Sequence, residues 1–167
     1  PDSFADLVEK MLPAVVNIST SQKVTRKSPH GFPDFDLPPG SPFKEFFDQF
    51  KQQRKGSPEP SEKATSLGSG FIIDSSGLIV TNNHVIDGAD QITVVMKDKR
   101  RLEAKVVGKD EKTDLALLKV ESAKPLPALE WGDSDKARVG DWVLAIGNPL
   151  GLGGSVSAGI ISARGRD

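Results

Sequence analysis

The sequence predicts an all-β protein, and two observations carry that prediction. From Leu67 onward the chain holds seven short runs rich in valine and isoleucine, separated by turn residues such as Gly77 and Gly88. It contains no cysteine, which excludes disulfide and cysteine–zinc scaffolds. Many short strands at this spacing are typical of a sandwich or a small barrel. We expect strands at 69–74, 78–82, 91–96, 102–108, 115–120, 141–147 and 155–163.

The N-terminal segment predicts a short amphipathic helix over residues 2–12, followed by a strand over 14–20. Its apolar residues recur at helical spacing, at Phe4, Leu7, Val8 and Met11. Ser3 with Asp6 resembles a capping box, and we expect Pro13 to end the helix. The apolar stripe needs a partner. We expect it to dock on its own domain, with a contact between subunits as the alternative.

Residues 21–63 differ sharply in composition from the rest of the chain. Seven of the twelve prolines and six of the eight phenylalanines fall within residues 28–60. Because proline blocks regular strand pairing, this segment predicts a long loop, with a possible helical piece over 42–54. Four phenylalanines there fit one helix face that needs a hydrophobic partner, or that folds back on the parent domain. They are Phe43, Phe46, Phe47 and Phe50.

Charge and hydropathy exclude several classes of partner. The 22 basic and 23 acidic residues give a net charge of −1, which argues against nucleic acid as a partner. No apolar run approaches the roughly 18 residues that span a bilayer, so membrane association is not indicated. No signal peptide is visible, and the polar start at Pro1 is what a mature or trimmed chain would show.

One histidine and one aspartate lie at positions that suit a role in proton transfer. His84 follows the apolar run at residues 78–80, whereas His30 lies in the proline-rich segment and is expected to be solvated. Asp114 directly precedes the apolar run at 115–120, where a carboxylate is partly buried and needs a partner. Each also has a simpler interpretation, as a structural histidine and as a turn or cap carboxylate. If they meet, Asp114 accepts the Nδ1–H of His84 and leaves Nε2 free to take a proton.

The blocks around these two residues resemble the HtrA/DegP family, DegQ-like members included, of trypsin-like periplasmic serine proteases. The similar blocks are residues 67–74, 77–86, 114–120 and 140–149, in the family's order and spacing. The resemblance covers residues 2–20 and 64–167. Residues 21–63 match the family's long LA loop in position and style, not residue by residue.

The resemblance implies a trypsin-like fold of two six-stranded barrels, of which this chain holds the first and two strands of the second. The implied divisions are a helix and first strand (1–20), an LA-type loop (21–63), the rest of the first barrel (64–130), and the inter-barrel link with the truncated second barrel (131–167). A lone two-stranded hairpin is marginally stable. It should therefore pack on the first barrel, pair with another copy, or be completed by a second polypeptide.

The resemblance also implies a role for each candidate residue. His84 is then the general base and Asp114 orients it, whereas the family's serine, in a G-N-S-G-G motif, has no match in this sequence. We therefore expect no hydrolysis by this chain alone. The implied parent degrades unfolded or damaged proteins in the bacterial periplasm without cofactor or metal. It forms trimers that build larger cages, with Phe4, Leu7 and Met11 as candidate trimer contacts and the four phenylalanines of residues 43–50 as cage contacts.

No other serine replaces the missing nucleophile. Ser134 follows Gly132 and Asp133, but Asp135 stands where the chemistry needs glycine, and its charge would oppose a developing oxyanion. Three further serines are expected to be strand residues, namely Ser69, Ser155 and Ser157.

Two other function classes stay open. One is a non-catalytic module that binds unfolded polypeptide as a chaperone would, or that mediates oligomerisation, which the exposed phenylalanines favour. The other is a structural β-domain in which His84 and Asp114 never meet. The distance between these two side chains separates the structural domain from the protease lineage.

Overall fold

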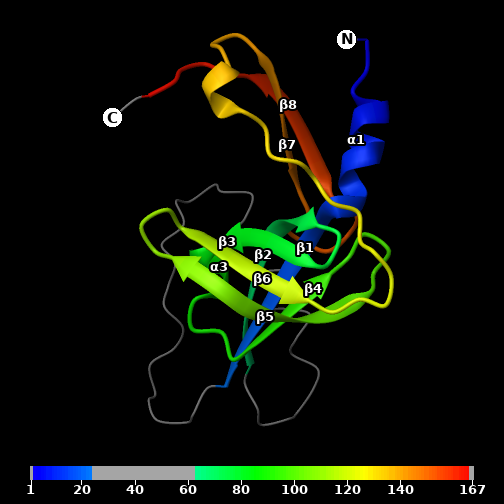
Figure 1. Ribbon diagram of the computed structural model, residues 1–167, viewed down its shortest axis with the longest axis vertical. Coiled ribbons are helices and arrows are strands. Elements are labelled where there is room, and N and C mark those ends of the chain that lie inside the picture. The colour runs from blue at the N-terminus through cyan, green and yellow to red at the C-terminus, as the bar shows by residue number, and fades with distance from the viewer. Residues whose placement is uncertain (1, 24–62, 166–167) are drawn as a thin grey trace, which may run out of the picture. The chain divides into compact units, whose positions relative to one another are not determined.

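Six antiparallel strands close into a barrel, and a separate two-stranded hairpin follows it along the chain (Figure 1). The computed structural model describes residues 2–23 and 63–165, of which residues 2–22 and 64–165 lie in one compact unit. Around the barrel the strands run in the order β1-β2-β3-β6-β5-β4. Their bounds are β1 Val15–Lys23, β2 Lys63–Asp74, β3 Leu78–Asn82, β4 Gln91–Val95, β5 Arg101–Asp110 and β6 Leu115–Val120. The all-β prediction is confirmed.

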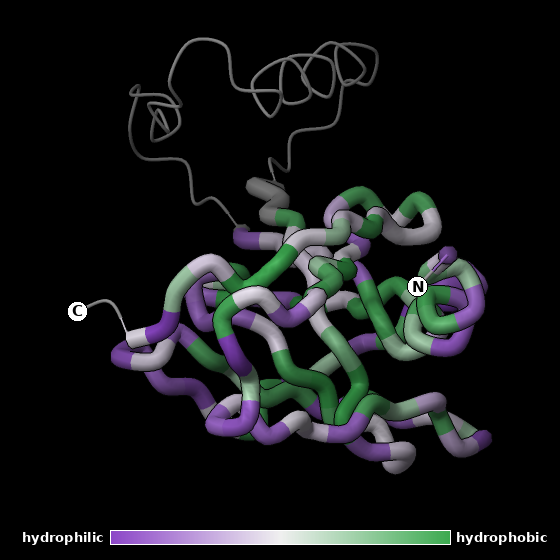
Figure 2. The backbone as a smooth tube through the Cα atoms, turned by 90° about the horizontal axis from the view of Figure 1, so that it is seen from above, coloured by the Kyte–Doolittle hydropathy of each residue, from purple (hydrophilic) through white to green (hydrophobic). Residues whose placement is uncertain are grey.

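Alternating side chains fill the barrel. In β6, Ala116, Leu118 and Val120 are buried, whereas the residues between them face outward, as the two-residue repeat of a strand requires. Figure 2 shows hydrophobic residues along the strands and hydrophilic residues in many of the turns. The largest fully buried side chains are Ile18, Ile72, Ile79, Leu118, Val16, Val94 and Val120. The barrel core is therefore aliphatic, as the valine and isoleucine runs predict.

The predicted strands are all present, with ends that move by up to six residues, the largest change being the start of β2 at Lys63. Strand β3 begins and ends as predicted, whereas β8 (Ser155–Ile160) stops three residues short of residue 163. Residues 21–23 and Lys63, assigned to the loop by composition, belong to β1 and β2 instead, because the two strands extend beyond the apolar residues that mark them. His30 and the candidate helix at 42–54, with its four phenylalanines, lie outside the described residues.

The N-terminal helix is shorter than predicted. Helix α1 spans Ala5–Met11 and continues as a 3-10 turn, Leu12–Ala14, that contains Pro13. The predicted capping box is wrong: Phe4 is the N-cap residue, and the Ser3 hydroxyl accepts a hydrogen bond from the backbone N–H of Ala5 instead (3.1 Å). No residue of α1 is fully buried.

A second short helix follows β3 directly. Residues Asn83–Ile86 form the helical turn α3, so His84 lies on a helix and not on the strand end that its apolar neighbours predict. The turn Asp74–Gly77 that precedes β3 requires glycine, because Gly77 has φ +105° and its Cα faces the Val120 carbonyl oxygen. Together these two features set where β3 starts and where it stops.

The hairpin pairs β7 (Trp142–Gly147) with β8 and is tied to the barrel by side-chain hydrogen bonds. The buried Asn17 donates from Nδ2 to the carbonyl oxygens of Gly68 (3.1 Å) and Asn148 (3.0 Å), and the Asn148 N–H donates to the Ser69 hydroxyl (2.8 Å). Hydrogen bonds thus attach the residue that follows β7 to the first barrel, whereas pairing with another copy and completion by a second polypeptide stay predictions. All six residues of β8 are nevertheless exposed.

Candidate active site

The barrel topology brings His84 and Asp114 together from positions 30 residues apart. Strands β3 and β6 are antiparallel neighbours, and Asn82 at the end of β3 faces Leu115 at the start of β6. His84 comes two residues after Asn82, on α3, and Asp114 comes one residue before Leu115. Both side chains therefore lie at the same end of the barrel.

Asp114 contacts His84 through both carboxylate oxygens. Oδ2 of Asp114 lies 2.5 Å from Nδ1 of the His84 imidazole, and Oδ1 of Asp114 accepts a hydrogen bond from the backbone N–H of His84 at 2.8 Å. The simpler interpretation, in which the two side chains never meet, is therefore wrong. In the neutral ring this contact places the proton on Nδ1, so that Nε2 carries the lone pair and can accept a proton.

The backbone of Asp114 is held as firmly as its side chain. Its φ is +55°, in the left-handed region that side-chain-bearing residues seldom adopt. Its carbonyl oxygen accepts hydrogen bonds from the backbone N–H of Asn83 and from Nδ2 of Asn82, each at 3.0 Å. Sequence reasoning missed Asn82, although an asparagine just before a short helix is a usual capping signal.

The site is open to solvent on one side. The His84 side chain is 70% exposed and that of Asp114 is 42% exposed, which agrees with the predicted partial burial of the carboxylate. The backbone N–H of His84, and then its imidazole, hold the pKa of the Asp114 carboxyl below its ordinary value. Asp114 is therefore an anion at neutral pH and can stabilise a positive charge on the ring.

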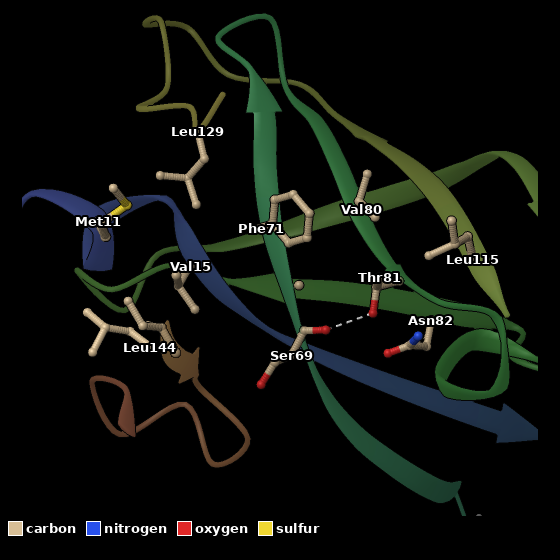
Figure 3. Close-up of a pocket in the computed structure, with 12 residues that line it drawn as sticks. Met11, Val15, Ser69, Phe71, Val80, Thr81, Asn82, Leu115, Leu129 and Leu144 are labelled. Atoms are coloured by element: carbon tan, nitrogen blue, oxygen red, sulfur yellow. Dashed lines mark hydrogen bonds between the residues drawn. The ribbon is translucent and has the colours of Figure 1, made fainter. Parts of the chain in front are cut away.

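An open cavity of about 380 Å³ lies beside the pair, between the barrel and the hairpin. The barrel contributes Phe71, Val80 and Leu115, and β7 contributes Leu144, with Ser69 and Thr81 joined by a hydrogen bond in its wall (Figure 3). No titratable side chain lines the cavity. It can cover apolar groups but offers the His–Asp pair no further acid or base.

The remaining candidate serines have structural surroundings. The Ser69 hydroxyl accepts the Asn148 N–H, and its carbonyl oxygen accepts the Thr81 hydroxyl (2.8 Å). Ser134 begins a 3-10 turn, Ser134–Lys136, and its carbonyl oxygen accepts a hydrogen bond from Arg164 (3.0 Å). Ser155 and Ser157 lie on β8.

Within residues 2–23 and 63–165, no cluster of histidine, cysteine, aspartate or glutamate could hold a metal ion. The same residues contain no helix long and apolar enough to cross a membrane.

The N-terminal candidates for subunit contact occupy different positions. Phe4 meets Trp142 of β7 edge-on, with ring centroids 5.8 Å apart. Leu7 is 44% exposed, and Met11 lines the cavity beside the His–Asp pair.

A closed six-stranded barrel with a hydrogen-bonded His–Asp pair at one end defines a trypsin-like peptidase domain. The chain belongs to that family, because its residues 68–167 match the family model described as "Trypsin-like peptidase domain". The fold and the family resemblance expected from the sequence are thus confirmed.

Curated relatives narrow the comparison to one branch of the family. The chain is 50% identical to a "Probable periplasmic serine endoprotease DegP-like" of Rickettsia conorii, covering 99% of this chain and 32% of the relative. It is 52% identical to a protein of the same description from Pseudomonas putida, covering 99% and 35%. This chain therefore spans about a third of the length of the curated relatives it matches.

A solved structure agrees with this placement. The protein described as "HtrA-type protease AlgW with tripeptide" matches with a TM-score of 0.70 and 38% identity, over 99% of this chain and 41% of that one. The resemblance therefore extends to the three-dimensional fold.

Proposed function

We propose that this chain supplies the general base and the orienting carboxylate of a serine endopeptidase that degrades unfolded or damaged proteins in the bacterial periplasm. The observation that carries the proposal is the 2.5 Å contact between His84 Nδ1 and Asp114 Oδ2. The names of the relatives, which include "periplasmic" and "serine endoprotease", support the compartment and the reaction. The tripeptide in the structure of the solved relative supports a peptide substrate.

In the proposed reaction His84 takes a proton at Nε2 from a serine hydroxyl as that oxygen attacks a peptide carbonyl. Asp114 keeps the proton on Nδ1 and stabilises the imidazolium that forms. His84 then returns the proton to the leaving amine. No G-N-S-G-G motif lies within residues 1–167, so we place the serine in another part of the protein. No metal or cofactor enters this scheme.

Hydrolysis assays test this proposal. The 167-residue chain should cleave neither casein nor short peptides, and a fluorophosphonate probe should not label it. A longer product that also carries the serine should be labelled and should cleave casein. In that product, Asp114→Asn should lower kcat by about 10⁴-fold through the wrong imidazole tautomer. Cleavage by the 167-residue chain that His84→Ala abolishes would contradict the placement of the serine.

A second candidate function is the binding of unfolded polypeptide. Apolar side chains on the hairpin and the loop within it favour it, because Trp142 is 62%, Ile160 54% and Leu152 81% exposed. Covering exposed apolar area of this kind lowers the free energy of the system. The test is suppression of aggregation of a denatured client by the chain, compared with a Leu152→Ser variant.

We also propose Phe4, Leu7 and Met11 as a contact between copies of the chain. Support comes from α1, which has no fully buried residue, and from the exposed side chain of Leu7. Light scattering should give a mass above the 17.9 kDa of one chain, and Leu7→Glu should lower it. The four phenylalanines of residues 43–50, proposed as cage contacts, lie outside the described residues.

A further inference from the structure

We propose that Asn82 is a positioning residue that holds Asp114 in the conformation from which its carboxylate reaches His84. This inference rests on the proposed protease function and adds a residue to its site. Asn82 occupies the N-cap position of α3, in extended conformation, yet its side chain makes no capping hydrogen bond to its own helix. It donates from Nδ2 to the Asp114 carbonyl oxygen instead (3.0 Å).

Helix α3 is capped by a residue from another part of the chain. A helix begins with backbone N–H groups that have no partner inside the helix, and a side chain at the N-cap position usually accepts one of them. Here the first two of these groups, on Asn83 and His84, are both accepted by Asp114. Asp114 thus caps α3 from the turn that precedes β6, and Asn82 stabilises Asp114 in return.

The conformation of Asp114 shows why this return contact matters. A left-handed residue other than glycine carries a conformational cost, and it persists only when its surroundings hold it. Two donors fix its carbonyl oxygen, and one of them, the N–H of Asn83, belongs to the backbone that substitution leaves in place. The amide of Asn82 is the donor that a substitution removes. Once Asp114 relaxes toward an ordinary φ, its Cα–Cβ bond changes direction. The carboxylate then loses its hydrogen bonds to the backbone N–H and to Nδ1 of His84.

Asn82 is exposed, so the substitution can be made without opening the core. Asn82→Ala deletes the donor, and Asn82→Gln keeps an amide for rescue. Thr113→Ala is the matched control: it loses one hydrogen bond in the same loop, from the Thr113 hydroxyl to Asp110 (2.8 Å), without touching the Asp114 carbonyl oxygen. Asp114→Asn reports on the pair itself.

The test is NMR on the 167-residue chain, with the ¹³Cγ titration of Asp114 and the low-field Nδ1–H resonance of His84 as readouts. We expect Asn82→Ala to raise the pKa of Asp114 toward its ordinary value and to broaden or remove the Nδ1–H signal. Asn82→Gln should restore both in part, and Thr113→Ala should leave both as in the parent chain. In a longer product that carries the serine, Asn82→Ala should lower kcat/KM by roughly three- to tenfold.

The outcomes separate this inference from the proposed function. If Asp114→Asn removes the Nδ1–H resonance but Asn82→Ala leaves both readouts unchanged, the inference is overturned and the His–Asp pair stands. If Asp114→Asn itself leaves the resonance unchanged, the pair does not exist in solution, and both proposals are overturned. An equal effect of Thr113→Ala would show that the loop responds to any lost hydrogen bond, which also overturns a specific role for Asn82.

Discussion

Removing the Asn17 side chain should detach the hairpin from the barrel. Asn17 lies on β1, is only 3% exposed, and donates from Nδ2 to one carbonyl oxygen of the barrel and to one beyond β7. Asn17→Ala abolishes both hydrogen bonds and leaves their acceptors facing a small cavity. The backbone of residue 17 keeps its place in the barrel, because it pairs with Val95 whatever its side chain.

The expected cost follows from the two lost contacts. Each hydrogen bond contributes a net ~1 kcal/mol, and a buried acceptor left without a partner adds a desolvation penalty of similar size. We therefore expect Asn17→Ala to lower the free energy of unfolding by about 2–4 kcal/mol. Only the bond to Asn148 joins the barrel to the hairpin, so about 1–2 kcal/mol of the loss should fall there and speed amide exchange in the hairpin roughly 5- to 30-fold.

Hydrogen exchange and urea unfolding measure the two quantities. Exchange is followed residue by residue in β7 and β8 and compared with β3 and β6, which accept neither of the Asn17 side-chain hydrogen bonds. Trp142 lies on β7, so its fluorescence in a Trp131→Phe background reports on the hairpin. Gln91→Ala, at an exposed position of β4, serves as the control and should change stability by less than about 0.5 kcal/mol.

One result would refute the reasoning. If Asn17→Ala speeds exchange equally in the hairpin and in β3 and β6, the side chain stabilises the whole unit and does not specifically attach the hairpin. If neither exchange nor unfolding changes, the two hydrogen bonds contribute nothing measurable. The aromatic contact between Phe4 and Trp142 would then be the next attachment to examine.

Two further predictions concern a turn and the acid limit of stability. Gly77→Ala should cost roughly 2–6 kcal/mol in urea unfolding, since φ is +105° and the new Cβ would lie 2.2 Å from the Val120 carbonyl oxygen. Gly108→Ala, where a Cβ meets nothing within 4 Å, is its control. Folding lowers the pKa of Asp114 below its ordinary value of 3.8, so the unfolded chain binds more protons. The contribution of Asp114 to the free energy of unfolding is therefore present above pH 3.8 and is lost as the pH falls through the lower folded value. Asp114→Asn should therefore flatten the fall in urea stability between about pH 5 and pH 2; an unchanged slope would contradict this.

The barrel could be predicted from the sequence because its strands are local patterns. The run Leu115–Val120 is apolar at every position except Lys119 and has the length of a strand, and both features are visible in the residue types alone. The turn at Gly77 is likewise marked by its glycine. By contrast α3 was not predicted, since its four residues after the expected strand 78–82 show no helical repeat. Asp114, 30 residues away, caps it, and no local pattern contains that contact.

The candidate site likewise combines residues that local patterns predict with contacts between distant parts of the chain. His84 and Asp114 could be chosen from their residue types and flanking blocks. Asn82 was missed because its partner, the Asp114 carbonyl oxygen, lies 32 positions along the chain in the turn before β6. The attachment of the hairpin through Asn17 was equally hidden. A buried asparagine within a β-strand has no signature that names its acceptors.

The geometry of the site depends on the register between β3 and β6. Ile79 faces Leu118 in that register, and both side chains are completely buried. A slip of one residue would shift β6 by about 3.4 Å and turn its buried face outward, which the aliphatic core opposes strongly. The same slip would carry Asp114 beyond hydrogen-bond reach of His84. The core that closes the barrel therefore brings Asp114 within reach of His84, and the proposed role of Asn82 is to hold the Asp114 backbone so that the 2.5 Å contact forms.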